Sequence, residues 1–444
     1  MTQSIREIPE LRAMDDRRSL IRIAYETDIP VTPRVRHLID SQEFRRLGQI
    51  SQLGLVGHVY PSARHSRFEH SLGVYRMALQ YLQRLSYDER FREAIAVPDA
   101  EVFLTSALLH DLGHWPFCHP IEDMRLPGVP QHELFANSFL LEGEIADCLR
   151  DDWGIQPRDV VSLLSEKPRD RKSRILASML SGPIDVDKMD YLVRDSLHAG
   201  VPYGRNFDQQ RLIGSLCLNA DASGLAISEK GRTAAEMMVF ARYVMFSEVY
   251  WHHAVRAATA MLQRAFYLLH GELELDTLFR LAEHDWIVQM QGAAGNGPAR
   301  ELLEGLFGLR RKLYKRWVQF SYFQQRELYN GIARRPYPWL AAFSEQLADV
   351  LSRHAGCRIA PHEILVDAPP TKLEVQFQVD VHFSKEGQYR ALGDISPVVS
   401  TLAREQFDDY VKRVRVFVHP RLREELVGGG ALPEELIRQA IARM

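Results

Sequence analysis

The sequence predicts a mainly α-helical protein that carries a small α+β unit at its C-terminal end. From about 30 to 330, apolar residues recur at helical spacings, as in 35–53. Segment 233–270 is the longest such pattern and contains neither Pro nor Gly, so we expect a single uninterrupted helix there. These observations predict an all-helical core.

The pattern changes after Pro336 and Pro338. Segments 373–383 (LEVQFQVDVHF) and 413–418 (RVRVFV) alternate apolar and polar residues, which is typical of strands. We therefore divide the chain into a helical domain and a C-terminal α+β subdomain. Their boundaries are 1–335 and 336–444.

Composition and charge exclude several classes of protein. The 444 residues are 46% hydrophobic and 25% charged, which is ordinary for a globular protein. The net charge of −3 argues against a nucleic-acid partner, although a few local cations could still bind a small polyanion. The N-terminus has no signal segment, and apolar runs such as 102–109 are too short to cross a membrane. The four cysteines form no CxxC pair, so we expect a cytoplasmic protein with reduced thiols.

Histidines are concentrated between residues 58 and 132, often beside carboxylates. Within LTSALLHDLGHWPFCH (104–119), an apolar helix leads into the adjacent pair His110–Asp111. An imidazole and a carboxylate at the end of a buried helix cost free energy unless another group compensates them. A divalent cation would do so, since His nitrogen and Asp oxygen are ordinary ligands. Two ligands do not complete a site, so the others must come from elsewhere in the chain.

Two further segments can supply them. Segment 64–74 (RHSRFEHSLGV) places Arg67 and His70 on one helical face. Segment 185–195 (DVDKMDYLVRD) suits a helix that holds a metal, a sugar and a phosphate together. One face of that helix carries Asp187, Tyr191 and Asp195, with Lys188 beside it.

That acidic segment has an alternative interpretation. It could be a solvated charged face stabilised by pairs four residues apart, such as Asp190–Arg194. Taken alone, the segment favours this second interpretation.

In their order along the chain, these motifs resemble the HD superfamily, and more narrowly its deoxynucleoside triphosphate (dNTP) triphosphohydrolase branch. The dipeptide HD is common by chance, but FEHS before it and DVDKxDY after it make the ordered set specific. The resemblance covers about residues 20–270. It runs through 52–74, 110–122, QHE (131–133), 185–195 and ARYVMFSEVYWHH (241–253).

The resemblance implies an HD-domain core that uses a divalent metal ion to hydrolyse a dNTP to deoxynucleoside and triphosphate. The residues leave the metal open among Mn, Fe, Co, Ni, Zn and Mg. The implied metal ligands are His70, His110, Asp111 and Asp187. The implied catalytic group around the scissile phosphate is His114, His119, Glu122 and His132, with His132 and Glu122 as an oriented pair.

The resemblance also implies a substrate pocket. Cations at separate positions would hold the polyphosphate, as its several charges require. These are Arg67, Lys188 and Arg242. The sugar pocket would consist of Gln52, Leu53, Tyr191 and Asp195, and the base would pack on Tyr250. Structural interpretations stay open for three of these residues: Arg67 could pair with Glu69 or another acid, Arg242 could cap a helix, and Tyr250 could be plain core.

The sequence departs from the family pattern in several places. Trp115 stands where relatives usually have a small residue, so it could narrow the pocket, stack on a base or pack outward. Phe246 and Trp251 leave the base preference open. Segment 24–31 lacks the stretch that accompanies nucleotide-activated members, which argues against such activation. The helical core and the C-terminal α+β unit resemble the bacterial members, several of which form dimers or tetramers, so we expect a homo-oligomer.

Two alternative functions remain at this stage. One is an HD phosphohydrolase for another nucleotide, such as a nucleoside monophosphate, a cyclic dinucleotide or guanosine tetraphosphate. The other is a catalytically silent nucleotide sensor. The sugar-pocket residues argue against the first, and the complete ligand set argues against the second.

Overall fold

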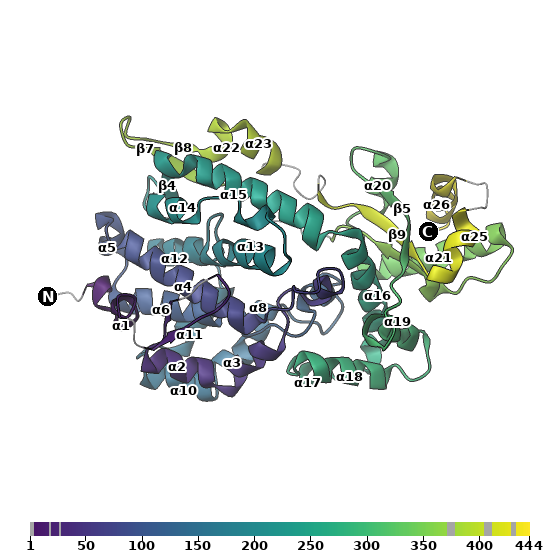
Figure 1. The fold of residues 1–444 in the computed structure, drawn as a ribbon, viewed down its shortest axis with the longest axis horizontal. Helices are drawn as coiled ribbons and strands as arrows, with labels where there is room; N and C mark the ends of the chain where they lie inside the picture. The colour runs from purple at the N-terminus through teal and green to yellow at the C-terminus, as the bar shows by residue number, and fades with distance from the viewer. Residues whose placement is uncertain (1–3, 17–18, 26–27, 371–377, 404–410, 428–431) are drawn as a thin grey trace.

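Helices make up most of the protein, and the described residues also form three small sheets at the periphery of the helices (Figure 1). The computed structural model describes residues 4–16, 19–25, 28–370, 378–403, 411–427 and 432–444. The prediction of a mainly α protein with a small α+β portion is confirmed. Within the described residues, no helix is long and apolar enough to cross a membrane.

The centre of the bundle is α4, which packs against α6 on one side and α13 on the other. Ser66 caps the start of α4 by accepting a hydrogen bond from the Glu69 amide, and Asp185 caps α13 in the same way. The helices around the predicted site are α2 (Pro33–Asp40), α3 (Gln42–Arg46), α4 (Arg67–Leu85), α6 (Val97–Leu109), α7 (Cys118–Glu122), α8 (His132–Phe135), α13 (Val186–His198), α15 (Arg232–Met245) and α16 (His253–Leu269). Other elements before residue 300 include α1 (Pro9–Arg12), β1 (Leu20–Ile21), β2 (Ile29–Pro30), α5 (Glu89–Ala94), α9 (Asn137–Leu140), α10 (Glu144–Asp151), α11 (Pro157–Ser165), α12 (Arg171–Ser181), α14 (Gln209–Ser215), α17 (Leu275–Phe279) and α18 (Glu283–Ala293).

The prediction of one uninterrupted helix over 233–270 is wrong. After α15 the chain forms a π-helical turn, Phe246–Tyr250, and α16 begins only after His252, whose side chain caps it. Periodicity does not reveal this break, because a π turn inserts a residue without changing the apolar character of the segment. Segment 35–53 is likewise divided, since Ser41 ends α2 and caps α3.

The helical pattern also fails near 315. After α19 (Pro298–Phe307) the chain forms strand β5 (Lys315–Phe320), and α20 (Arg326–Ile332) follows it. Strand β5 and β6 (Ile364–Asp367) pair antiparallel on either side of β9 (Val414–Val418), which confirms the strand predicted at 413–418. Helix α21 (Tyr337–Ala355) packs on this sheet, and α25 (Arg423–Val427) and α26 (Pro433–Ile441) end the chain.

The other predicted C-terminal strand joins a different sheet. Strand β7 (Asp380–Phe383) is the described part of 373–383 that forms a strand, and 371–377 lie outside the described residues. The sheet order is β3 (Leu216–Leu218), β4 (Leu225–Ser228), β7 and β8 (Gln388–Ala391). With α22 (Leu392–Ile395) and α23 (Pro397–Ala403), β7 and β8 lie over α15 (Figure 1). The domain boundary at 335/336 stays a prediction. In the four-stranded and the three-stranded sheet, strands from before this boundary pair with strands from after it.

Candidate metal-dependent active site

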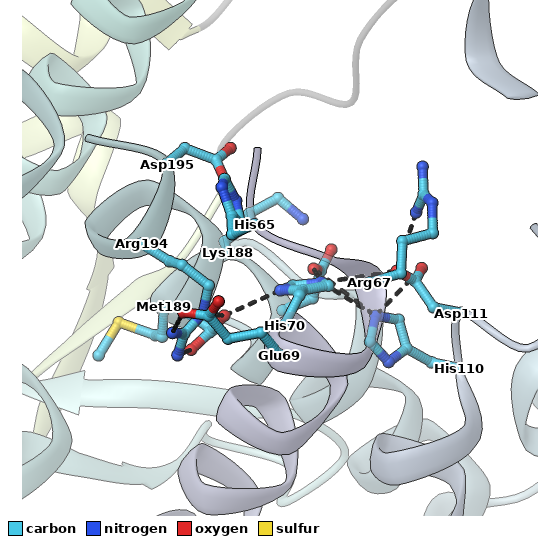
Figure 2. Close-up of polar contacts among 12 residues, drawn as sticks. His65, Arg67, Glu69, His70, His110, Asp111, Lys188, Met189, Arg194 and Asp195 are labelled. Carbon is cyan, nitrogen blue, oxygen red and sulfur yellow. Dashed lines mark hydrogen bonds and ion pairs between the residues drawn. The ribbon is translucent and has the colours of Figure 1, made fainter. Parts of the chain in front are cut away.

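The first cluster of the site is centred on His70, in the first turn of α4. The imidazole is buried, and its Nδ1 lies 2.8 Å from Asp190 Oδ2. Its Nε2 faces Asp187 Oδ1 at 3.1 Å and His110 Nε2 at 3.2 Å (Figure 2). One ring nitrogen is therefore tied to a supporting carboxylate, while the other points into the cluster.

His110 is oriented in the same manner by the backbone. It directly follows α6, and its Nδ1 lies 2.9 Å from the carbonyl oxygen of Ala107. Because that carbonyl only accepts, the Nδ1 proton is fixed and Nε2 is left as a lone pair. In their neutral forms, the two imidazoles would therefore direct their Nε2 lone pairs at one point in space.

Asp111 closes this cluster from the other side. Its Oδ1 lies 3.4 Å from His110 Nε2, and its Oδ2 lies 4.0 Å from His70 Nε2. Arg67 donates to Oδ2 at 2.8 Å, so Arg67 does pair with an acid, and that acid is Asp111 and not Glu69. Burial raises the pKa of Asp111, but His114 and Arg67 outweigh it and hold that pKa well below its usual range. The carboxylate is ionised.

This donor set fits a divalent metal ion. Ligand atoms at about 2 Å from one ion lie about 3 Å apart, which matches the separation of the two facing nitrogens. One oxygen of Asp187 and these two nitrogens all lie within 4.8 Å of one another. Burial lowers the pKa of His70, but its hydrogen bonds to Asp187 and Asp190 more than offset this and raise it to about 10. A cation would displace that proton and balance the surrounding carboxylates.

The ion pair Asp190–Arg194 supports the metal cluster. The sequence alone did not reveal this supporting role. Arg194 donates to Asp190 through Nε at 2.8 Å and Nη2 at 2.6 Å, and both side chains are buried. A Cβ at Gly73 would overlap Asp190 Oδ1 and Arg194 Nη2, so α4 needs glycine where the pair crosses it. The spacing of this pair in the sequence favours a solvated charged face. The pair lies instead inside the protein and orients His70.

The second cluster lies on the other side of Asp111. His114 Nδ1 is 3.1 Å from Asp111 Oδ1, and the rings of His114 and His132 are 4.0 Å apart. His132 Nδ1 lies 2.9 Å from Glu122 Oε2, so these two residues form the expected oriented pair. The side chain of His119 is 61% exposed, and its Nδ1 lies 4.0 Å from the same carboxylate. Nitrogen atoms of the three histidines lie within 4.8 Å of one another.

A glycine allows the two segments of this cluster to meet. A Cβ at Gly113 would overlap the carbonyl oxygen of His132 and the amide nitrogen of Ala136. The start of α8 therefore packs directly on the turn that follows His110–Asp111. Trp115 follows this turn and packs away from the cluster. Its side chain is fully buried, and its ring stacks on that of Phe279 with the ring centroids 4.2 Å apart.

The predicted phosphate-binding cations lie on three helices, α4, α13 and α15. Arg67 reaches Asp111, while Lys188 Nζ is held 2.6 Å from Asp185, the buried cap residue of α13. Burial raises the pKa of Tyr191 to about 12, although the charges of Arg242 and Lys188 act to lower it. Arg242 is buried near Phe246, with its guanidinium carbon 5.4 Å from that ring.

Two residues of the predicted sugar pocket, Tyr191 and Asp195, lie on α13. Asp195 is buried, and Tyr250 donates its hydroxyl to Asp195 Oδ2 at 2.6 Å. The π-helical turn places Tyr250 in this position, so Tyr250 is more than a packing residue. Gln52 and Leu53 precede the 3₁₀ turn Gly54–His58, and Gln52 Oε1 is buried with no hydrogen-bond partner among the described residues.

Comparison with known proteins identifies the family. The HD domain family model matches residues 67–195, and the model of the HD associated region matches residues 207–432. The chain therefore belongs to the HD-domain family of phosphohydrolases.

Individual relatives agree with this assignment. An uncharacterized protein of Methanocaldococcus jannaschii is 34% identical over 68% of this chain and 60% of its own length. A protein named deoxynucleoside triphosphate triphosphohydrolase SAMHD1 homolog, from Dictyostelium discoideum, is 32% identical over 37% of this chain and 34% of its own. The chain thus spans 60% or less of the length of these curated relatives.

Solved structures share the fold over most of the chain. A hypothetical protein from Aquifex aeolicus has a TM-score of 0.68 at 27% identity and covers 90% of this chain and 96% of its own. A phosphohydrolase from Bacteroides thetaiotaomicron has a TM-score of 0.66 at 21% identity, with coverages of 90% and 99%.

Proposed function

We propose that the protein is a metal-dependent dNTP triphosphohydrolase, which cleaves a dNTP to a deoxynucleoside and triphosphate. The observation that carries the proposal is the position of Asp111. Its Oδ2 accepts a hydrogen bond from Arg67, and its Oδ1 lies near His110 of the metal cluster and His114 of the second cluster. A phosphoryl group next to Asp111 would reach a cation, the metal cluster and the second group of histidines at once.

In this proposal His70, His110, Asp111 and Asp187 hold the metal ion. When bound, a divalent ion supplies Lewis-acid polarisation of a phosphate oxygen and lowers the pKa of a neighbouring water. The donor set is compatible with Mn, Fe, Co, Ni, Zn or Mg.

The three cations would neutralise the polyphosphate along its length. The Lys188 ammonium is fixed by Asp185, and Arg67 is fixed by Asp111, so both are already in place before substrate binds. Arg242 would complete the set from α15. Preorganised cations stabilise charge that develops on the phosphoryl oxygens in the transition state.

The second cluster would manage the protons. Attack of water on the α-phosphorus breaks the bond to the sugar oxygen, which leaves with the deoxynucleoside and must gain a proton. We propose that His132, oriented by Glu122, and His119 serve the water and the leaving oxygen, with His114 positioned against Asp111. His119 is the exposed member, so it is the one that a substrate can reach directly.

The sugar would lie against Asp195, Tyr191, Gln52 and Leu53, and the base against Tyr250. The SAMHD1 relatives, whose names describe dNTP hydrolysis, support this choice of substrate. We extend the proposal to a homo-oligomer, dimer or tetramer, in the cytoplasm. Light scattering of the purified chain would test the oligomer.

The deciding experiment is product identification with the purified chain. Each of the four dNTPs, an NTP and a dNMP is incubated with each candidate metal. The proposal expects deoxynucleoside and tripolyphosphate in equal amounts, from dNTPs and only with metal. Orthophosphate as the sole product would contradict it, and hydrolysis of the dNMP alone would favour a nucleoside monophosphate as substrate. Nucleotide binding without any turnover would favour the sensor.

A further inference from the structure

His65 occupies a place in the site that neither the sequence motifs nor the proposed chemistry uses. It precedes α4, and its imidazole is fully buried against α13. His65 Nε2 lies 2.9 Å from Asp195 Oδ1, while the Tyr250 hydroxyl occupies Oδ2 (Figure 2 shows His65 beside Asp195). Both oxygens of the predicted sugar-binding carboxylate are therefore engaged by the protein before any substrate arrives.

The burial of His65 fixes the direction of this hydrogen bond. Its Nδ1 is buried and has no hydrogen-bond partner among the described residues. A proton on Nδ1 would be an unsatisfied buried donor, which costs about 1–3 kcal/mol. The single proton of a neutral ring therefore belongs on Nε2, where it is donated to Asp195.

His65 is itself held by a series of side-chain contacts that runs through His198 and Glu69 to Arg194. Its ring stacks on His198 at 4.3 Å with an interplanar angle of 17°. His198 Nε2 lies 2.9 Å from Glu69 Oε1, which also accepts from Arg194 Nη1 at 2.9 Å. Arg194 is the residue that supports Asp190 and, through it, His70. The sugar end and the metal end of the site therefore share one buried support.

We propose that His65 is a positioning residue that holds the Asp195 carboxylate in the orientation needed to accept the 3′-hydroxyl of a deoxyribose. The inference rests on the proposed function, because it assumes that Asp195 faces the sugar. Each carboxylate oxygen has two acceptor positions, so each keeps one for substrate after His65 and Tyr250 have bound. With both oxygens anchored, the carboxylate cannot rotate and the remaining acceptor positions have fixed directions.

The test compares substrates with and without the 3′-hydroxyl. The dNTP that the wild type hydrolyses fastest is paired with its 2′,3′-dideoxy counterpart. His65→Phe keeps the ring stack but removes the donor, so we expect kcat/KM for the dNTP to fall about tenfold or more. The value for the dideoxy substrate should hardly change. His65→Gln, whose amide can still donate, should recover most of the loss.

His37 provides the matched control. It forms a similar pair with Asp152 at 2.8 Å, but its side chain is 58% exposed and lies away from the site. His37→Phe should leave kcat/KM unchanged for both substrates. Equal losses on both substrates in His65→Phe, or no recovery in His65→Gln, would show a purely structural role and overturn the inference.

A binding measurement separates this inference from the proposed function. Calorimetry with the four deoxynucleosides and their dideoxy counterparts needs no turnover. If the wild type hydrolyses no dNTP, the proposed function fails, yet weaker binding of only the 3′-hydroxyl compounds in His65→Phe would still support His65. A wild type that binds each pair equally, or binds neither, overturns the inference whatever the turnover.

Discussion

The two histidine clusters on either side of Asp111 differ in how firmly the protein holds them. In the metal cluster, the Nδ1 atoms of His70 and His110 are both fixed, one by Asp190 and the other by a backbone carbonyl. In the second cluster, His132 is fixed by Glu122 and His114 lies against Asp111, but His119 is largely exposed and its Nδ1 is 4.0 Å from the Glu122 carboxylate.

This difference suggests a division of labour. Metal ligands must be at fixed distances before the ion binds, so their supporting hydrogen bonds are built into helices. Groups that exchange protons with a substrate tighten only when that substrate is present, and an open position such as that of His119 allows this. Each cluster can therefore be disturbed separately.

The largest effect is expected from loss of a metal ligand. His110→Gln removes one of the two facing nitrogens, so we expect the metal content to fall and turnover to drop to the level measured without metal. Metal analysis together with product formation would check this. His37→Gln is the control on the surface. Full turnover with an unchanged metal content would contradict the assignment of His110.

The next largest effect is expected in the second cluster. His132→Gln should lower kcat by about 10²–10⁴, which is the usual contribution of a positioned acid or base. The metal content should stay at the wild-type level, because His132 supports no predicted ligand. Simultaneous loss of metal would mean that the two clusters are one unit.

A smaller effect is expected when the support of the metal cluster is disturbed. In Gly73→Ala the new methyl group would displace the Asp190–Arg194 pair, so metal affinity should weaken about 10–100-fold and stability should fall. Titration with Mn²⁺ and thermal unfolding would measure both effects. Gly214→Ala is the matched control: this exposed helical glycine has no neighbour within 4 Å of the added carbon, so we expect a gain of about 0.4–1 kcal/mol. Equal responses of the two variants would contradict the steric argument.

The smallest effect concerns Trp115, which neither cluster uses. Trp115→Phe should reduce the free energy of unfolding by only about 1–2 kcal/mol, partly because it removes a buried indole N–H that has no partner among the described residues. KM and the order of preference among the four dNTPs should not change. Kinetics on the dNTP panel would measure this, and a changed base preference would place the indole at the nucleotide.

The sequence by itself determined the class of fold and most of the residues that meet in the site. Helical periodicity is a local property, so α4, α6 and α13 could be predicted from it. The pair His110–Asp111 indicated a metal because adjacent buried polar groups need compensation, and the ordered motifs indicated which other segments to join to it. Strand β5 was missed because six residues, KRWVQF, alternate too briefly within a helical pattern.

Only the tertiary structure decided how these residues are supported. The burial of Asp190–Arg194 under Gly73, the stacking of Trp115 on Phe279 and the bond from His65 to Asp195 all join segments that are far apart in the chain. Gly73, an isolated glycine three residues after His70, was the one local signal of a close approach. Such contacts depend on how helices pack together and not on spacing within one helix, so no local pattern specifies them.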